Sequence, residues 1–139
     1  MEITPGLILA MWSAGMAGGA ALVAHWTIVG PGYSWLVAAV VTLVGAAAAA
    51  AAGSALGVVG VAAALLAGVL ARKGRLAPVL FAVAGVSFLA VASGDGGVVA
   101  ALSGTVLLGG MTSEMMLGHW FLVDPQLPRW ALKRLDLVA

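Results

Sequence analysis

The chain has two histidines, and both begin the same short sequence pattern. His25 and His119 each start an HWxxVxP motif, and a further tryptophan follows ten or eleven residues after each histidine. A neutral imidazole nitrogen is a common axial ligand of haem iron and can hydrogen bond to a quinone carbonyl. Two such rings on two helices would make a minimal haem b or quinone site, so His25 and His119 are the candidate cofactor-binding residues.

The same two His-Trp pairs also fit a purely structural role. Tryptophan is enriched at the boundary between membrane and water, where its ring is partly apolar and partly polar. Both pairs come at the ends of apolar runs, and basic residues follow the second pair. The alternative is therefore a belt of interfacial anchors. The candidate anchors are Trp26, Trp35, Trp120, Trp130, Arg129, Lys133 and Arg134.

Glu114 is a carboxylate inside a long apolar run. An ionisable residue within a membrane span costs a few kcal/mol on insertion scales and is by default a functional candidate. The residue types predict a proton relay or an ion-coupling group; the structural alternative is a hydrogen bond to a neighbouring helix or to Ser87. His119 follows Glu114 by five residues, about 140° around a helix, so the two do not share a face.

The composition places the chain in a membrane. It is 63% hydrophobic and only 8% charged, whereas soluble domains contain roughly 25% charged residues. A net charge of +1 does not favour nucleic acid as a partner, and the lack of cysteine excludes disulfides and thiolate metal sites. No nucleophile with an adjacent base and no metal-ligand cluster is present in the pattern. We therefore predict one transmembrane domain over residues 1–139 with no catalytic and no metal site.

Apolar runs predict five transmembrane helices, over about residues 6–29, 35–52, 56–71, 77–93 and 98–123. The run from Trp35 to Ala71 would be about 55 Å long as a single helix, too long for a hydrocarbon core of roughly 30 Å. We therefore divide it near Gly53. A four-span alternative would keep this run whole and reverse the orientation of the N-terminus.

Two basic clusters set the predicted orientation. One lies at 72–75 and the other in the tail, and the positive-inside rule assigns both to the cytoplasm. The N-terminus is then outside, in a protein of the inner (cytoplasmic) membrane. The first residues lack the basic region of a signal peptide, so the first run stays as a span. Residues 124–139 are predicted to form a short amphipathic interfacial segment. Because the HWxxVxP motif occurs twice, an alternative is that the chain is the first part of a longer repeat protein.

The first span carries a face made for close helix contact. Gly15 and Gly19 form a GxxxG motif, which lets another helix approach closely. Residues 11–26, MWSAGMAGGAALVAHW, resemble the opening helix of the polysulfide-reductase-type quinol-interacting membrane subunits, which also begin with an aromatic residue and a glycine-rich face. The resemblance covers one span of a family with eight helices, so it implies no site residues here.

These features predict a small non-catalytic accessory or anchor subunit of a larger membrane complex. A respiratory or redox complex, with a quinone or haem site at the cytoplasmic leaflet, is the favoured setting. Its partners would be membrane lipids and other membrane-protein subunits, or further copies of the chain. One alternative is a small transporter or channel subunit that uses Glu114 to couple protons or ions, and another is a structural assembly factor without chemistry.

Overall fold

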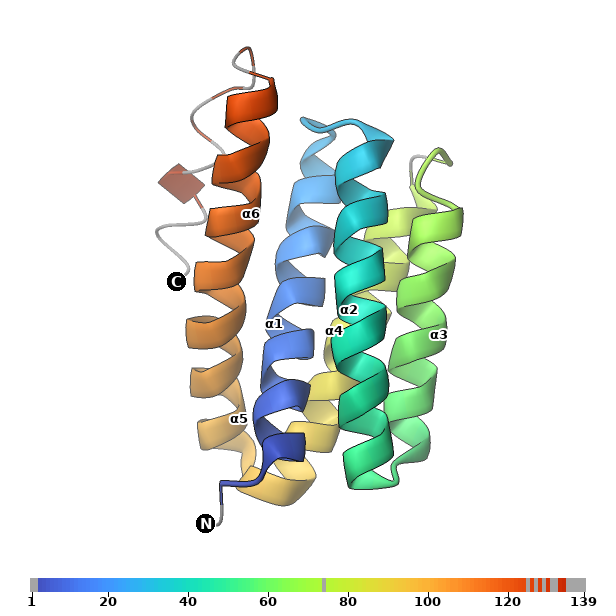
Figure 1. Ribbon diagram of the computed structural model, residues 1–139, viewed down its shortest axis with the longest axis vertical. Coiled ribbons are helices and arrows are strands. Elements are labelled where there is room, and N and C mark those ends of the chain that lie inside the picture. The colour runs from blue at the N-terminus through green and yellow to red at the C-terminus, as the bar shows by residue number, and fades with distance from the viewer. Residues whose placement is uncertain are drawn as a thin grey trace.

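The computed structural model describes residues 3–73, 75–124, 126, 128, 130, 133 and 134. Its regular elements are all helical. They are α1 (Pro5–Trp26), α2 (Pro31–Ala52), α3 (Ala55–Val69), α4 (Leu76–Gly96), α5 (Val98–Gly104), the π-helical turn η1 (Thr105–Gly109) and α6 (Gly110–Val123). Because α5, η1 and α6 follow one another without a break, they form one continuous rod, as Figure 1 shows.

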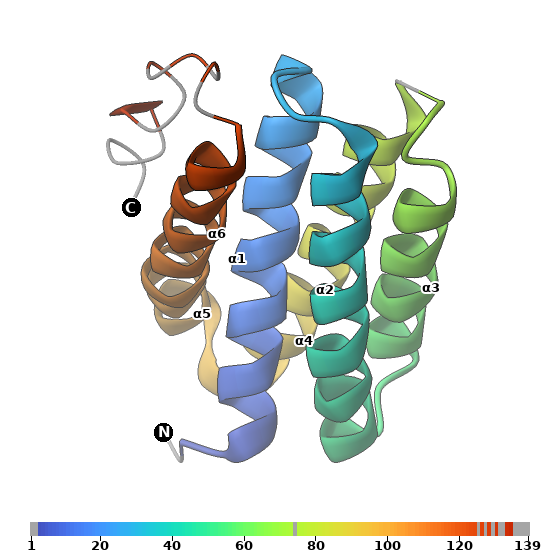
Figure 2. The ribbon, with the colours of Figure 1, turned by 45° about the horizontal axis from the view of Figure 1, so that its top comes forward.

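The helices form an antiparallel bundle (Figures 1 and 2), in which the described chain runs from one end to the other along α1, α2, α3, α4 and the α5–α6 rod in turn. Helix α1 is central: it packs against α2 and α4 on one side and against the α5–α6 rod on the other. Helix α3 closes the far side by packing against α2 and α4. The all-helical architecture predicted from composition is confirmed.

Four rods are long and apolar enough to cross a membrane, namely α1, α2, α4 and the 26-residue rod Val98–Val123. Helix α3 is equally apolar but has only 15 residues, so it is about 22 Å long against a hydrocarbon core of roughly 30 Å. The chain is therefore a multi-pass membrane protein by the length and composition of its helices.

The first turn between helices differs from its predicted position. Helix α1 ends at Trp26 because Thr27 takes a left-handed conformation with φ 52°. Helix α2 begins at Pro31, four residues before the predicted start of the second span at 35. Proline suits the first helical position because its missing N–H would have no partner there.

The predicted turn at 94–97 is also shorter than expected. Helix α4 continues through Gly96, and Gly97 with φ 79° reverses the chain alone. A single glycine is sufficient because its φ can be positive at little cost. The reversal between α4 and α5 is therefore very tight.

Glycine and alanine bring the helices close together in the core. Phe88 of α4 is fully buried and lies against Gly45 of α2 and Gly60 of α3. A Cβ at Gly45 would overlap the ring of Phe88, and one at Gly60 would lie 2.9 Å from it. The one large side chain therefore fills space that two neighbouring glycines leave open.

Large apolar side chains point outward in this bundle. Val99 is 79% exposed, Val69 is 76% exposed and Leu43 is 73% exposed. Such a surface suits a surrounding of hydrocarbon, because large apolar patches are uncommon on soluble monomers. Small residues thus line the contacts between the helices, and large apolar residues form the lipid-facing surface.

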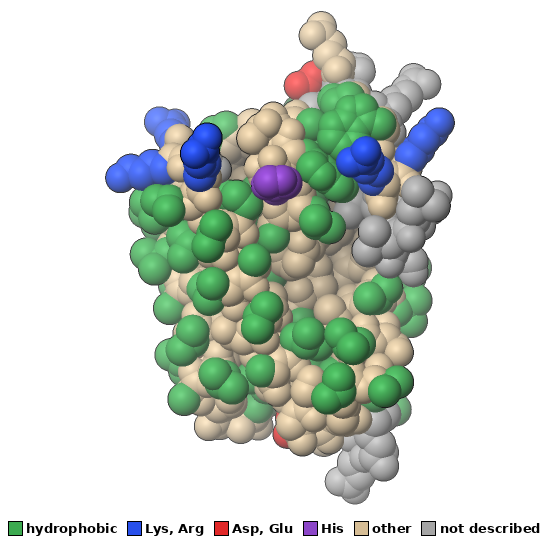
Figure 3. All heavy atoms as spheres, turned by 180° about the vertical axis from the view of Figure 1, so that it is seen from behind, with side chains coloured by type: hydrophobic (Ala, Val, Ile, Leu, Met, Phe, Trp, Pro, Cys, Tyr) green, Lys and Arg blue, Asp and Glu red, His purple; other side chains and the backbone are tan. Residues whose placement is uncertain are grey.

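Charge is concentrated at one end of this apolar body. Figure 3 shows the described Lys and Arg side chains gathered at the same end. Arg72, Lys73 and Arg75 lie in the turn between α3 and α4, and Lys133 and Arg134 follow the end of α6. Asp95 lies at the opposite end, beside the reversal from α4 to α5. The two basic clusters that the sequence places far apart thus lie at the same end of the bundle, on opposite sides of it.

Candidate functional site

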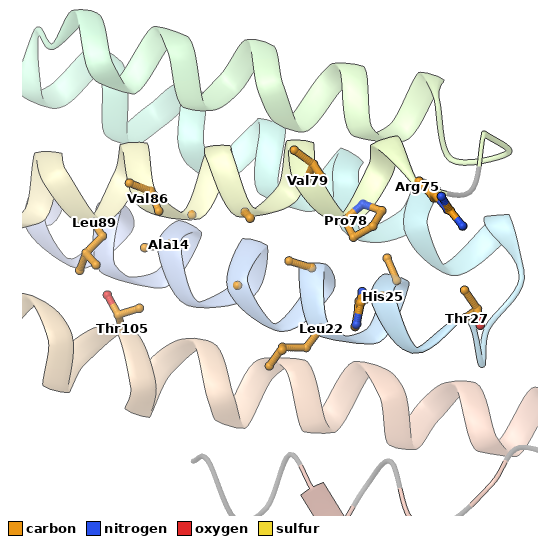
Figure 4. A pocket seen from close by; sticks show the side chains of 15 residues that line it. Ala14, Leu22, His25, Thr27, Arg75, Pro78, Val79, Val86, Leu89 and Thr105 are labelled. Carbon is orange, nitrogen blue, oxygen red and sulfur yellow. The ribbon is translucent and has the colours of Figure 1, made fainter.

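A groove of about 870 Å³ runs along the bundle between α1 and α4. Ala14, Gly18 and Leu22 of α1 line it, and Val79 and Val86 lie on the α4 side (Figure 4). From its polar mouth at the end of α1 it descends along α1 for about 16 Å, roughly half the thickness of a hydrocarbon core. Its depth therefore corresponds to one leaflet of a bilayer.

The floor of the groove is made by small residues. A Cβ added to Gly18 would meet nothing within 4 Å, so this part of α1 is recessed and open. Gly85 lies directly against the α1 backbone: a Cβ there would lie 3.3 Å from the carbonyl oxygen of Ala14 and from the amide nitrogen of Gly18. Close contact between the two backbones closes the floor, and the missing side chain at Gly18 leaves the space above it.

Polar groups collect at the mouth of the groove. His25, Thr27 and Arg75 line it there, and Figure 4 shows His25 on α1 and Arg75 at the start of α4. Arg75 is also the N-cap residue of α4, and its side chain makes no capping hydrogen bond. The first N–H groups of a helix carry a partial positive charge. The mouth therefore combines a guanidinium group, an imidazole ring and a helix N-terminus.

The deep end of the groove has one polar group. Thr105, at the start of the π-helical turn, lines the groove there. Its Oγ1 is buried and has no hydrogen-bond partner among the described residues. Apart from this hydroxyl, the body of the groove is apolar.

The two HWxxVxP motifs occupy different surroundings. Both histidines are exposed; His25 lines the groove, whereas His119 on α6 does not. Trp120 packs edge-on against Tyr33 of α2, with ring centroids 5.8 Å apart. The predicted cofactor shared by the two histidine rings stays a prediction.

Tryptophan and arginine stack at the cationic end. Trp26 meets Trp130 edge-on with ring centroids 5.3 Å apart, and the guanidinium carbon of Arg134 lies 5.2 Å from the centre of the Trp130 ring. Arg72 lies in the same way 5.4 Å from the centre of the Trp35 ring. The predicted anchor Arg129 lies outside the described residues, as do many residues of the predicted interfacial segment 124–139.

Glu114 lies on α6, about 13 Å before the end of that helix. Its Oε1 atom is buried and accepts no hydrogen bond from any described residue. Ser87, one of its predicted partners, instead donates to the carbonyl oxygen of Val83 at 2.8 Å. Glu114 is therefore the one acidic side chain of the rod Val98–Val123, and it has a buried oxygen without a partner.

The seam between α1 and the α5–α6 rod was only partly foreseen. The sequence singled out Gly15 and Gly19, and the structure places Gly15 against Thr105 and Gly109 and places Gly19 against Ser113. A Cβ at either glycine would overlap these neighbours. The π-helical turn η1 contacts Gly15 at this point, and no pattern in the sequence predicted that turn.

A hydrogen bond across the same seam was missed. Trp12 Nε1 donates to Thr112 Oγ1 at 2.9 Å, and that hydroxyl donates in turn to the carbonyl oxygen of Leu108 at 2.7 Å. Trp12 is the one tryptophan away from the charged end. Its position in mid-span was the available signal, because a buried indole N–H usually needs a partner.

Metal binding finds no ready site in the residues described above. Across the described ranges, no three His, Asp or Glu side chains lie together as metal ligands would. No protein-family model, no curated protein and no solved structure matches the chain. Its function must therefore be inferred from the groove, the seam and Glu114.

Proposed function

We propose that this chain is a small, non-catalytic accessory or anchor subunit of a larger complex in the inner (cytoplasmic) membrane. It crosses the bilayer five times, with its N-terminus outside and its cationic end in the cytoplasm. The clustering of the described Lys and Arg residues at one end supports this orientation under the positive-inside rule. Helix α3 provides the third of these crossings because it returns the chain between α2 and α4, and modest bilayer thinning accommodates its short length.

Glu114 is the observation that carries the proposal of a partner subunit. A buried acceptor without a hydrogen bond costs about 1–3 kcal/mol, and water cannot supply the missing donor inside a hydrocarbon core. Met111 and Met115, which flank Glu114 on α6, are 62% and 67% exposed. Because Oε1 is buried within this chain, a helix from another subunit could donate to the second carboxyl oxygen while packing on these two flexible side chains.

A redox setting remains part of this proposal. A quinone or haem b near His25 and His119 would assign the complex to respiration. Neither ring has a cofactor-specific contact that would distinguish these two groups. The redox class therefore rests on the residue types alone.

Ion or proton coupling is a second candidate function, favoured by the same carboxyl group. Glu114 has a buried oxygen without a partner, and it lies on a rod that packs along only one side of α1. If copies of the chain assemble around it, this carboxyl group could exchange a proton or hold a cation. The two functions differ in what Glu114 touches: a donor from another protein in the first, and a transported ion in the second.

Glu114→Leu and Glu114→Gln separate these possibilities. If a partner helix donates to the carboxyl group, Glu114→Leu weakens association at least about tenfold, equivalent to about 1.4 kcal/mol, while Glu114→Gln keeps an acceptor and weakens it less. The measurement is the mass and subunit stoichiometry of the complex in mild detergent. Met115→Leu, one residue away, is the control that alters the same surface without removing the acceptor.

Two results would count against the subunit role. A homogeneous monomer in mild detergent and in nanodiscs would contradict it directly. Loss of ion or proton flux in liposomes for Glu114→Gln, with unchanged assembly, would instead assign Glu114 to transport.

A further inference from the structure

We propose that the groove between α1 and α4 binds an anionic glycerophospholipid, with one acyl chain along the groove and its phosphate at the mouth beside Arg75 and His25. This site is separate from Glu114 on α6 and does not depend on the proposed partner subunit.

The apolar body of the groove fits an acyl chain in depth and in character. It runs from the charged end of the bundle to about the middle of the membrane, which is the distance that a lipid chain covers within its leaflet. Its volume of about 870 Å³ lies in the range of roughly 300–1,000 Å³ that is usual for small-molecule sites. Leu22, Val79 and Val86 present only carbon atoms to its interior.

The charge at the mouth selects the headgroup. Arg75 lines the mouth, and guanidinium groups bind phosphate through two parallel N–H donors. The N-terminus of α4 adds the positive end of its helix dipole at the same place, while Leu76 N–H already donates to the carbonyl oxygen of Lys73 and Pro78 has no N–H. The other described arginines of this end, Arg72 and Arg134, lie over tryptophan rings instead. Arg75 is therefore the arginine placed to hold the phosphate of a lipid whose chain lies in the groove.

Charge also argues against a second copy as the occupant. Copies inserted in the same orientation would bring their cationic ends to the same level, and like charges near the mouth would repel. A quinone would satisfy the apolar body but has no negative charge to pair with Arg75. Charge complementarity thus favours an anionic lipid over both alternatives.

Native mass spectrometry of the full chain, released from nanodiscs, tests the proposal. The probes are phosphatidylglycerol and phosphatidylcholine with identical acyl chains. We expect one phosphatidylglycerol to be retained per chain in preference to phosphatidylcholine. Arg75→Gln should reduce that retention about tenfold, which corresponds to the loss of one charged hydrogen-bonding group at about 1.4 kcal/mol. Arg72→Gln, in the same turn, should leave it unchanged.

A second pair of variants tests the groove itself. Gly18→Leu places a side chain in open space on the groove floor, so the protein folds while the acyl chain is displaced and retention falls about tenfold, by roughly 1.4 kcal/mol of lost apolar contact. Gly118→Leu is the matched control, because a Cβ there also meets nothing within 4 Å but lies on α6, outside the groove. Equal retention of the two lipids, insensitivity to Arg75→Gln, a retained quinone, or a dimer that buries the groove would each overturn the proposal.

Discussion

Trp12 and Thr112 form a polar contact between two helices at membrane depth. The indole N–H has little alternative to this hydroxyl, because the surrounding side chains of α1 and α6 are largely apolar. Hydrogen bonds between transmembrane helices contribute about 0.6 kcal/mol on average and up to about 1.7 kcal/mol. The contact therefore fixes the register of α1 against α6 more than it stabilises the fold.

We expect Trp12→Phe and Thr112→Val each to destabilise the folded protein, and the double variant to destabilise it by less than the sum of the two. The difference should be a coupling energy of about 0.6–1.7 kcal/mol. Reversible unfolding in mixed micelles of all four proteins measures it. Additive effects would show that the two side chains do not interact in the membrane.

Residue type alone was sufficient to single out Glu114, His25 and the tryptophans, because charged and amphipathic side chains are rare in such a chain. Residue type did not predict which neighbours these side chains contact in the fold. Ser87 was a reasonable donor for Glu114, but a serine inside a helix can satisfy itself by donating to the carbonyl four residues earlier, and Ser87 does so.

The helices meet through glycine faces, and not all of these glycines are equivalent. Gly15 of α1 touches the backbone of the π-helical turn, whereas Gly18 of the same helix faces open space in the groove. A helix–helix contact made of backbone atoms cannot yield as a flexible side chain can. The two positions therefore provide a matched comparison within one element.

We expect Gly15→Ala to push α1 away from the α5–α6 rod and to destabilise the protein by about 1–3 kcal/mol, as for an overpacked core. Gly18→Ala should be neutral or stabilising by up to about 1 kcal/mol, since alanine favours a helix and meets no neighbour there. Unfolding in sodium dodecyl sulphate, followed by circular dichroism, compares them. Equal effects of the two substitutions would contradict the close contact at Gly15.

The helices themselves were largely predictable from the sequence, because twenty or so apolar residues between turn signals have few other solutions. Their ends were less so: Pro31 is compatible both with stopping one helix and with starting the next. The π-helical turn at 105–109 could not be predicted, since Gly15, which it contacts, lies far away along the chain.

At the scale of the whole molecule, charge separates the two ends of the bundle. The structure brings the 72–75 cluster and the charged tail residues to one end, whereas Asp95 lies at the other. The proposed orientation places the first end in the cytoplasm. Because the chain contains no cysteine, a single introduced thiol can report on each end without a competing background.

We expect Lys73→Cys to react with a membrane-impermeant maleimide only after the cytoplasmic side is opened, and Asp95→Cys to react in intact spheroplasts. Both residues are exposed and lie in or next to turns, so labelling reports on the side of the membrane. Labelling of both positions from the same side would contradict a crossing by α4. Labelling with the two sides exchanged would reverse the orientation.

The groove could not be predicted at all. It forms between Gly18 and Val86, residues of two helices that are separated by two others along the chain. Neither carries a chemical signature, since glycine and valine occur on every face of this protein. Only the packing of α1 on α4 shows that Arg75, expected as a topology signal, lies at the mouth of an apolar space.

The turns at the Asp95 end are very short: Gly53 and Ser54 join α2 to α3, and Gly97 alone joins α4 to α5. An extended chain of several residues must enter the active site of a protease before it can be cut, and these turns cannot supply one without unwinding a helix. They should therefore resist cleavage, and they offer no epitope that an antibody could grasp. We therefore expect a water-soluble protein that binds this molecule to contact the opposite end, where the tryptophans and arginines lie.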